Sequence, residues 1–214
     1  LGKSQVQHAE ELGIMDADTT CVHMNFLRDG DAARVKQAGV SIIWCAANYL
    51  FVAEANDCRT QLPALYRDGV NVGLAIDTPS HTNPGDSATL AYFGAREAGD
   101  AIDAQSLLEM QTIGAAGTVG AADDIGSIEV GKKADIVIRR ADDPSSLGFD
   151  AINDLMLFQR SGNVDTVLVD GQVVYENGHS TRVDEAQVVA EARLSTRRII
   201  DRIGLTPSGS WPIV

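Results

Sequence analysis

The chain has 214 residues, of which 44% are hydrophobic and 22% are charged, a composition that is typical of globular proteins and excludes an intrinsically disordered one. Its formal net charge of −13 at pH 7 makes nucleic acid and anionic membrane surfaces unfavourable partners, because both carry negative charge. Cys21, Cys45 and Cys58 have neither disulfide nor metal-binding spacing, so we expect reduced thiols and a cytoplasmic location.

Residues 5–117 alternate short β-rich runs with amphipathic helical runs. After a helix that stops near Gly13, the expected strands cover 19–25, 40–48 and 70–77, with helices at 27–39, 58–69, 87–98 and 103–116. Asp103 is the expected N-cap of the last helix. Because each connecting helix must return the chain to the same edge, this order predicts a parallel sheet. The small residues of GAAGTVG, 114–120, are expected to let a helix pack closely.

The composition changes after residue 120. Two short β runs flank Asp170-Gly171, the strongest local signal for a hairpin in the chain. A terminal helix is expected at about 184–202, with Gly204 near its end. The sequence therefore predicts three regions: a parallel α/β part (1–120), a small antiparallel β part (121–182), and a C-terminal helix and tail (183–214).

Three polar residues are expected where strands end. In parallel α/β barrels the loops after the strands line the active site. His23 lies near the end of the first expected strand, Asn48 just past the second, and Asp77 at the end of the third. Asp77 is either an N-cap or Asx-turn residue, or a metal ligand that also takes a proton from metal-bound water. Its position after an apolar strand favours the second interpretation, because a buried carboxylate needs a cation or several donors nearby.

The remaining candidates have simpler structural interpretations beside the functional ones. His23 is either a neutral imidazole bonded to the backbone, the commoner case, or a group that polarises substrate or moves a proton. Asn48 either orients substrate or only terminates its strand. His81 lies in a loop rich in proline and threonine and is a candidate for substrate contact. Cys45 is interpreted as a core residue.

Five segments, in this order and spacing, resemble the C-terminal half of the amidohydrolase superfamily, in the branch of cytosine and guanine deaminases and triazine hydrolases. The most specific is IGSIEVGKKADIVI, which is similar to the segment that follows the barrel in that family. The others are similar to the sixth barrel strand, the eighth barrel strand, a later helix and the closing hairpin: CVHMNFL (21–27), DGVNVGLAID (68–77), LLEMQTIGAA (107–116) and VDTVLVDGQVVYENG (164–178).

The resemblance implies an α/β fold, namely the C-terminal portion of a (β/α)8 TIM barrel followed by part of a small β-sandwich. It implies that Asp77 binds one divalent metal ion, zinc or iron, and accepts the proton of the attacking water. His23 would hydrogen-bond the substrate or the hydroxide. The implied reaction is hydrolytic deamination of an amino-substituted purine, pyrimidine, pterin or triazine-like ring, with hydrolysis of a cyclic amide as an alternative.

The resemblance also implies that the site is completed from elsewhere. The family's His-x-His pair, its fifth-strand histidine and the associated glutamate would lie upstream of Leu1, and three strands cannot close a barrel. We therefore expect a missing N-terminal half of the same protein, or a second chain, as partner, and the resemblance allows a homo-oligomer. A metal-free fragment that acts as an assembly module is the alternative of a different class.

Overall fold

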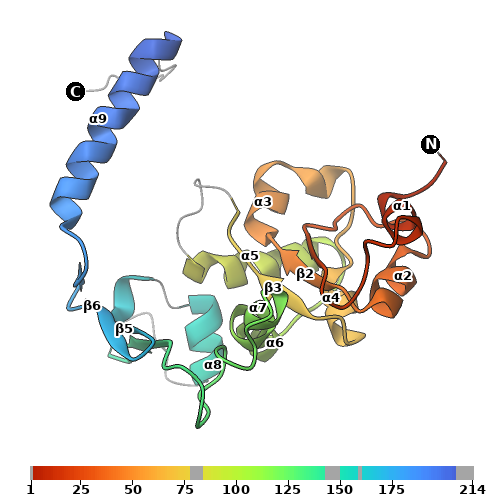
Figure 1. Ribbon diagram of the computed structural model, residues 1–214, viewed down its shortest axis with the longest axis horizontal. Helices are drawn as coiled ribbons and strands as arrows, with labels where there is room; N and C mark the ends of the chain where they lie inside the picture. The colour runs from red at the N-terminus through yellow and green to blue at the C-terminus, as the bar shows by residue number, and fades with distance from the viewer. Residues whose placement is uncertain (1, 78–83, 143–149, 159–160, 206–214) are drawn as a thin grey trace.

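A computed structural model describes residues 2–77, 84–142, 150–158 and 161–205 (Figure 1). Its elements in chain order are α1 (Gln5–Glu11), β1 (Thr20–Val22), α2 (Asp31–Ala38), β2 (Ser41–Trp44), α3 (Ala46–Phe51), η1 (Glu54–Asn56), α4 (Leu62–Arg67), β3 (Val72–Leu74), α5 (Pro84–Glu97), α6 (Ala104–Gln111), α7 (Ile113–Thr118), β4 (Ile136–Arg139), α8 (Ala151–Asn153), η2 (Asp154–Phe158, a π-helix), η3 (Ser161–Asn163), β5 (Val164–Val169), β6 (Gln172–Glu176), β7 (His179–Ser180) and α9 (Glu185–Ile203).

The first three strands form a parallel sheet in the order β1-β2-β3, which confirms the predicted parallel α/β arrangement. Ile42 is the register partner of Cys21 on one side and of Val72 on the other. All three residues of β3 are buried, as expected for a strand that helices cover on both faces. The core of this part lies around β2 and β3, and its largest fully buried side chains include Trp44, Tyr49, Leu62, Leu107 and Met110.

The second strand is shorter than predicted, because helix α3 begins where the strand was expected to continue. The strand ends at Trp44, and Tyr49 N donates to Cys45 O in the first turn of the helix. Ala46 and Ala47 favour this helix, since alanine has the highest helix propensity. Asn48 therefore lies on α3 rather than at a strand end, which corrects its expected place.

The predicted helix at 103–116 is two helices, with a break at Thr112, while Asp103 caps the first of them as expected. The second helix, α7, packs directly on β3. A Cβ atom built on Gly73 would lie 2.8 Å from Ala115 Cα, and one built on Gly114 would lie 2.7 Å from Val72 O. This confirms that the small residues of 114–120 permit close packing.

The second sheet is antiparallel in the order β4-β5-β6-β7. Asp170 and Gly171 connect β5 to β6 with φ values of 49° and 73°, so both adopt the left-handed conformation that a two-residue type I′ hairpin requires. The hairpin prediction is confirmed. The α/β class is confirmed as well, while a closed barrel and a β-sandwich stay expectations.

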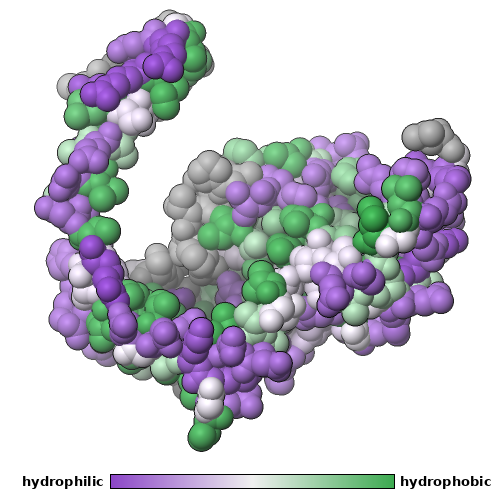
Figure 2. Space-filling model, viewed as in Figure 1, coloured by the Kyte–Doolittle hydropathy of each residue, from purple (hydrophilic) through white to green (hydrophobic). Residues whose placement is uncertain are grey.

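Helix α9 extends away from the rest of the chain (Figure 1). Asp184 caps its N-terminus by accepting a hydrogen bond from Gln187 N, and Gly204 ends it with φ 65°, in agreement with the predicted helix. Every residue of α9 is exposed except Ile200, which is half-buried. Apolar and polar residues both appear on its visible surface (Figure 2). Among the described residues, no helix combines the length and apolar character that crossing a membrane requires.

Candidate functional site

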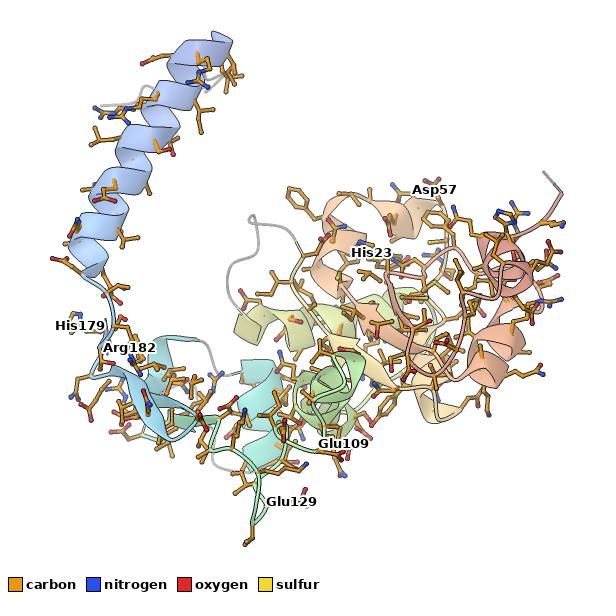
Figure 3. The ribbon with its side chains drawn as sticks, in the orientation of Figure 1. His23, Asp57, Glu109, Glu129, His179 and Arg182 are labelled. Carbon is orange, nitrogen blue, oxygen red and sulfur yellow. The ribbon has the colours of Figure 1, made fainter. Side chains whose placement is uncertain are left out.

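His23 and Asp77 come together at the carboxyl end of the parallel sheet. His23 directly follows β1, and its backbone N–H donates to Ile43 O at 2.9 Å, which holds the residue against β2. Asp77 lies three residues beyond β3. His23 Nε2 lies 3.7 Å from Asp77 Oδ2, although the two residues are 54 positions apart in the sequence. Figure 3 shows His23 within the α/β part, far from His179 beside the second sheet.

The backbone at both residues is unusual. His23 and Asp77 each have φ 70°, and Met24 has φ 55°. Side chains other than glycine seldom adopt the left-handed region, and such positions cluster at functional sites, where the surrounding structure maintains them. The strained turns redirect the chain just as each strand ends, so that the imidazole and the carboxylate share one edge of the sheet.

Cys45 is the third member of this group and was missed by the sequence analysis. It directly follows β2 and is 2% exposed, so its interpretation as a buried residue is correct. However, ligand atoms of His23, Cys45 and Asp77 all lie within 4.8 Å of one another. Burial, followed by the negative charges of Asp77 and Glu54, raises the pKa of the Cys45 thiol to about 11. Its place one residue after a strand, like that of His23, was the signal that identifies it.

A second polar pair lies close to the group. Asn25, which is 3% exposed, donates from Nδ2 to Glu54 Oε2 at 2.7 Å and so joins the loop after β1 to η1. The charge of Glu54 reaches the Cys45 thiol, since it contributes to the raised pKa of that group. The sequence carries no motif that would indicate this pair. It fixes the relative position of two loops that follow adjacent strands.

The two residues predicted to contact substrate, Asn48 and His81, are not joined to this group in the described structure. Asn48 lies on α3, one turn after Cys45, and its Oδ1 is buried without a hydrogen-bond partner among the residues that the structure describes. His81 lies outside the described residues. Neither residue is joined to His23 or Asp77 by a described contact, so their part in substrate binding stays a prediction.

The donor set of His23, Cys45 and Asp77 fits a divalent metal ion such as zinc. Imidazole nitrogen, thiolate sulfur and carboxylate oxygen are the ligands that zinc accepts in proteins. His23 Nδ1 is buried and has no partner within the described part of the chain, while its Nε2 faces Asp77. A carboxylate has two oxygens, so Asp77 can bind an ion through one and accept a proton at the other.

Known proteins resemble this chain in both sequence and fold. The chain is 29% identical to a 5-methylthioadenosine/S-adenosylhomocysteine deaminase of Thermoanaerobacter pseudethanolicus, over 94% of this chain and 48% of that protein. An adenosine deaminase of Xanthomonas campestris with bound zinc superposes with a TM-score of 0.86 and 27% identity, over 92% of this chain and 46% of that one. An atrazine chlorohydrolase of Arthrobacter aurescens, in complex with zinc and atraton, superposes with a TM-score of 0.79 and 25% identity, over 90% of this chain and 44% of that one.

The chain spans about half the length of the curated relatives it matches. The model of the amidohydrolase family matches residues 2–174, which include the parallel sheet, the site at its carboxyl end and most of the antiparallel sheet. The resemblance found in the five sequence segments is thereby confirmed. The chain belongs to the amidohydrolase family.

Proposed function

We propose that this chain contributes part of the active site of a zinc-dependent hydrolase that deaminates an amino-substituted heterocycle. The observation that carries the proposal is the convergence of His23 and Asp77, with Cys45, at the carboxyl ends of adjacent parallel strands in a chain of the amidohydrolase family. Loops at this end carry the active site in barrel enzymes. Zinc is preferred to iron because two similar solved structures hold zinc.

Asp77 is the residue that moves the proton. A divalent ion held at this site would activate the attacking water as a Lewis acid. The free oxygen of the Asp77 carboxylate would accept a proton from that water and later give it to the departing amino group. One C–O bond forms at the ring carbon, one C–N bond breaks, and ammonia leaves, so the carboxylate ends each cycle ionised. Asp77 is thus base and then acid.

His23 is proposed to act on the oxygen that attacks the ring carbon. Its Nε2 lies 3.7 Å from Asp77 Oδ2, close enough to hydrogen-bond the oxygen that adds to the substrate. The backbone hydrogen bond from His23 to Ile43 keeps the ring near this position. We expect His23 to hold the attacking oxygen and to stabilise the charge that develops on it.

Further metal ligands and barrel strands must come from outside this chain in the proposed enzyme. Three strands are too few to close a barrel. With His23 assigned to the attacking oxygen, Asp77 and Cys45 provide fewer than the three protein ligands that a catalytic zinc uses. In this proposal residues 1–120 are the last three βα units of the barrel, residues 121–182 belong to a β-sandwich, and residues 183–214 form the terminal helix and tail. An N-terminal half of the same protein supplies the rest.

The substrate class that we propose is a purine nucleoside of the adenosine type. Two relatives are named for deamination of adenosine derivatives, 5-methylthioadenosine/S-adenosylhomocysteine in one and 5′-deoxyadenosine in the other. An adenosine deaminase is the structural neighbour with a TM-score of 0.86. The amino group at the ring carbon of adenine is the leaving group that the mechanism requires.

The test is an assay of the full-length gene product, purified with its metal, on 5′-methylthioadenosine, S-adenosylhomocysteine and adenosine. We expect about one zinc per chain and release of ammonia. The Asp77→Asn variant should lose zinc and at least about a hundredfold in turnover. Asp123→Asn, at an exposed carboxylate outside the group of His23, Cys45 and Asp77, is the control and should keep both. A ring-opened acid as product would indicate a cyclic amide hydrolase, and a protein without metal or turnover would indicate an assembly module.

A further inference from the structure

Helix α9 presents an apolar face that nothing in the described chain covers. Six apolar side chains, at intervals of one, three or seven residues, lie within about a third of the helix circumference at 3.6 residues per turn, and Thr196 lies in the same arc. We name this face the α9 stripe: Val188, Val189, Ala192, Ile199, Ile200 and Ile203. Val188 and Ile199 are 52% and 56% exposed. The opposite face carries charged residues, among them Arg197, Arg198 and Asp201.

A helix of this kind needs a partner. Helices in water gain most of their stability by packing an amphipathic face rather than from intrinsic propensity. Figure 1 shows α9 standing clear of the parallel sheet and its helices, linked to the body through β6 and β7. The stripe therefore indicates a surface that becomes buried in the assembled protein.

We propose that the α9 stripe is the docking surface for the half of the enzyme that completes the barrel, an inference that rests on the proposed function. The occupant is thus a segment of the same protein, not a second copy of this chain and not a lipid surface. A lipid surface is disfavoured by the formal net charge of −13.

The superposition on the adenosine deaminase supports this occupant. It leaves 8% of the present chain unmatched, which is fewer residues than lie between Glu185 and Val214, so part of α9 lies within the matched region. The superposition of that region as a whole has a TM-score of 0.86. The present chain covers 46% of the deaminase, so more than half of that protein has no counterpart here. We infer that the corresponding half of the present protein packs beside the helix.

The body of the chain has exposed apolar groups that require the same partner. Strand β1 is an edge strand of the parallel sheet, with Val22 49% exposed and Phe26 59% exposed beside it. An unpaired strand edge with apolar neighbours is a surface that proteins cover. A half-barrel that pairs with β1 and also packs on the α9 stripe would bury both surfaces at once.

Amide hydrogen exchange distinguishes the occupants. The exchange rates of the α9 amides are measured in the 214-residue chain and in the full-length gene product, each at a low and a high protein concentration. We expect α9 amides to exchange at least about 100-fold more slowly in the full-length protein, at both concentrations. Fast exchange in both proteins, or protection that appears only at high concentration together with a dimer in sedimentation, would overturn the proposal. A gene that encodes nothing before Leu1 would overturn it as well.

Matched variants in the full-length protein separate packing from helix formation. Ile199→Glu places a charge within the stripe, whereas Leu194→Glu makes the same change about 140° away around the helix. The two residues are similarly exposed, at 56% and 53%. We expect Ile199→Glu to speed α9 exchange at least about 10-fold and Leu194→Glu to leave it unchanged. Equal effects would contradict the proposal. Deaminase activity is measured in a separate assay. If the protein proves not to be a deaminase, the exchange rates of α9 still test whether the stripe is buried.

Discussion

Replacing Gly114 by alanine should destabilise the protein, although the glycine lies in a helix, where alanine is the better residue. In most helices this change gains about 1 kcal/mol, because glycine loses more backbone freedom on folding. The new Cβ would lie 2.7 Å from Val72 O and 3.0 Å from Glu109 O, and both atoms belong to backbone that cannot rotate away. Overpacking of this kind costs about 1–3 kcal/mol, and rigid neighbours place Gly114 at the upper end. We expect a net loss of about 1–2 kcal/mol.

Gly94→Ala in α5 is the matched control. A Cβ atom there would lie 4.0 Å from the rings of Trp44 and Tyr49, an ordinary contact, so the same substitution should stabilise by about 0.5–1 kcal/mol. Urea unfolding of both variants in the full-length protein gives the two free energies, with an unchanged slope as the sign that only stability has altered. If both variants shifted the midpoint in the same direction, the close contact between α7 and β3 would not be the cause.

Three further variants test the core, a loop contact and a titrating pair. Leu107→Ala removes a fully buried side chain and should cost about 2–5 kcal/mol in chemical unfolding. Asn25→Ala removes the donor to Glu54 and should cost about 1–3 kcal/mol of unfolding free energy. Asn25→Asp should cost more, because two carboxylates then face each other. Equal stability of the unmodified protein and both variants would argue against this contact. Burial and then the hydrogen bond to Glu109 raise the pKa of Tyr66 to about 12, so the stability from this pair is present below pH 10 and is lost as the pH rises from 10 to 12. The same hydrogen bond lowers the pKa of Glu109, so a second loss occurs as the pH falls below 4.5, and Tyr66→Phe should flatten stability against pH at both ends.

Local chemistry was sufficient to predict much of the fold. Asp170 and Gly171 tolerate positive φ, so the hairpin follows from two residues alone. Asp103 caps its helix because its carboxylate reaches Ser106 N within one turn. The alternation of apolar strands with helices allows only a parallel sheet, which in turn places the residues after each strand at one edge. His23 and Asp77 were predicted on that reasoning.

Tertiary structure decided the features that depend on contacts between distant segments. Cys45 could be predicted as buried from its apolar surroundings, but its distance from His23 and Asp77 depends on how three loops turn after their strands. The left-handed backbone at His23 and Asp77 was not predicted, because non-glycine residues adopt it only at a few positions and no turn motif marks these two. The break at Thr112 arises where α7 meets β3 backbone to backbone. Sequence patterns report the preferences of neighbouring residues, whereas these positions are set by atoms that are 20 or more residues away in the chain and become neighbours only when it folds.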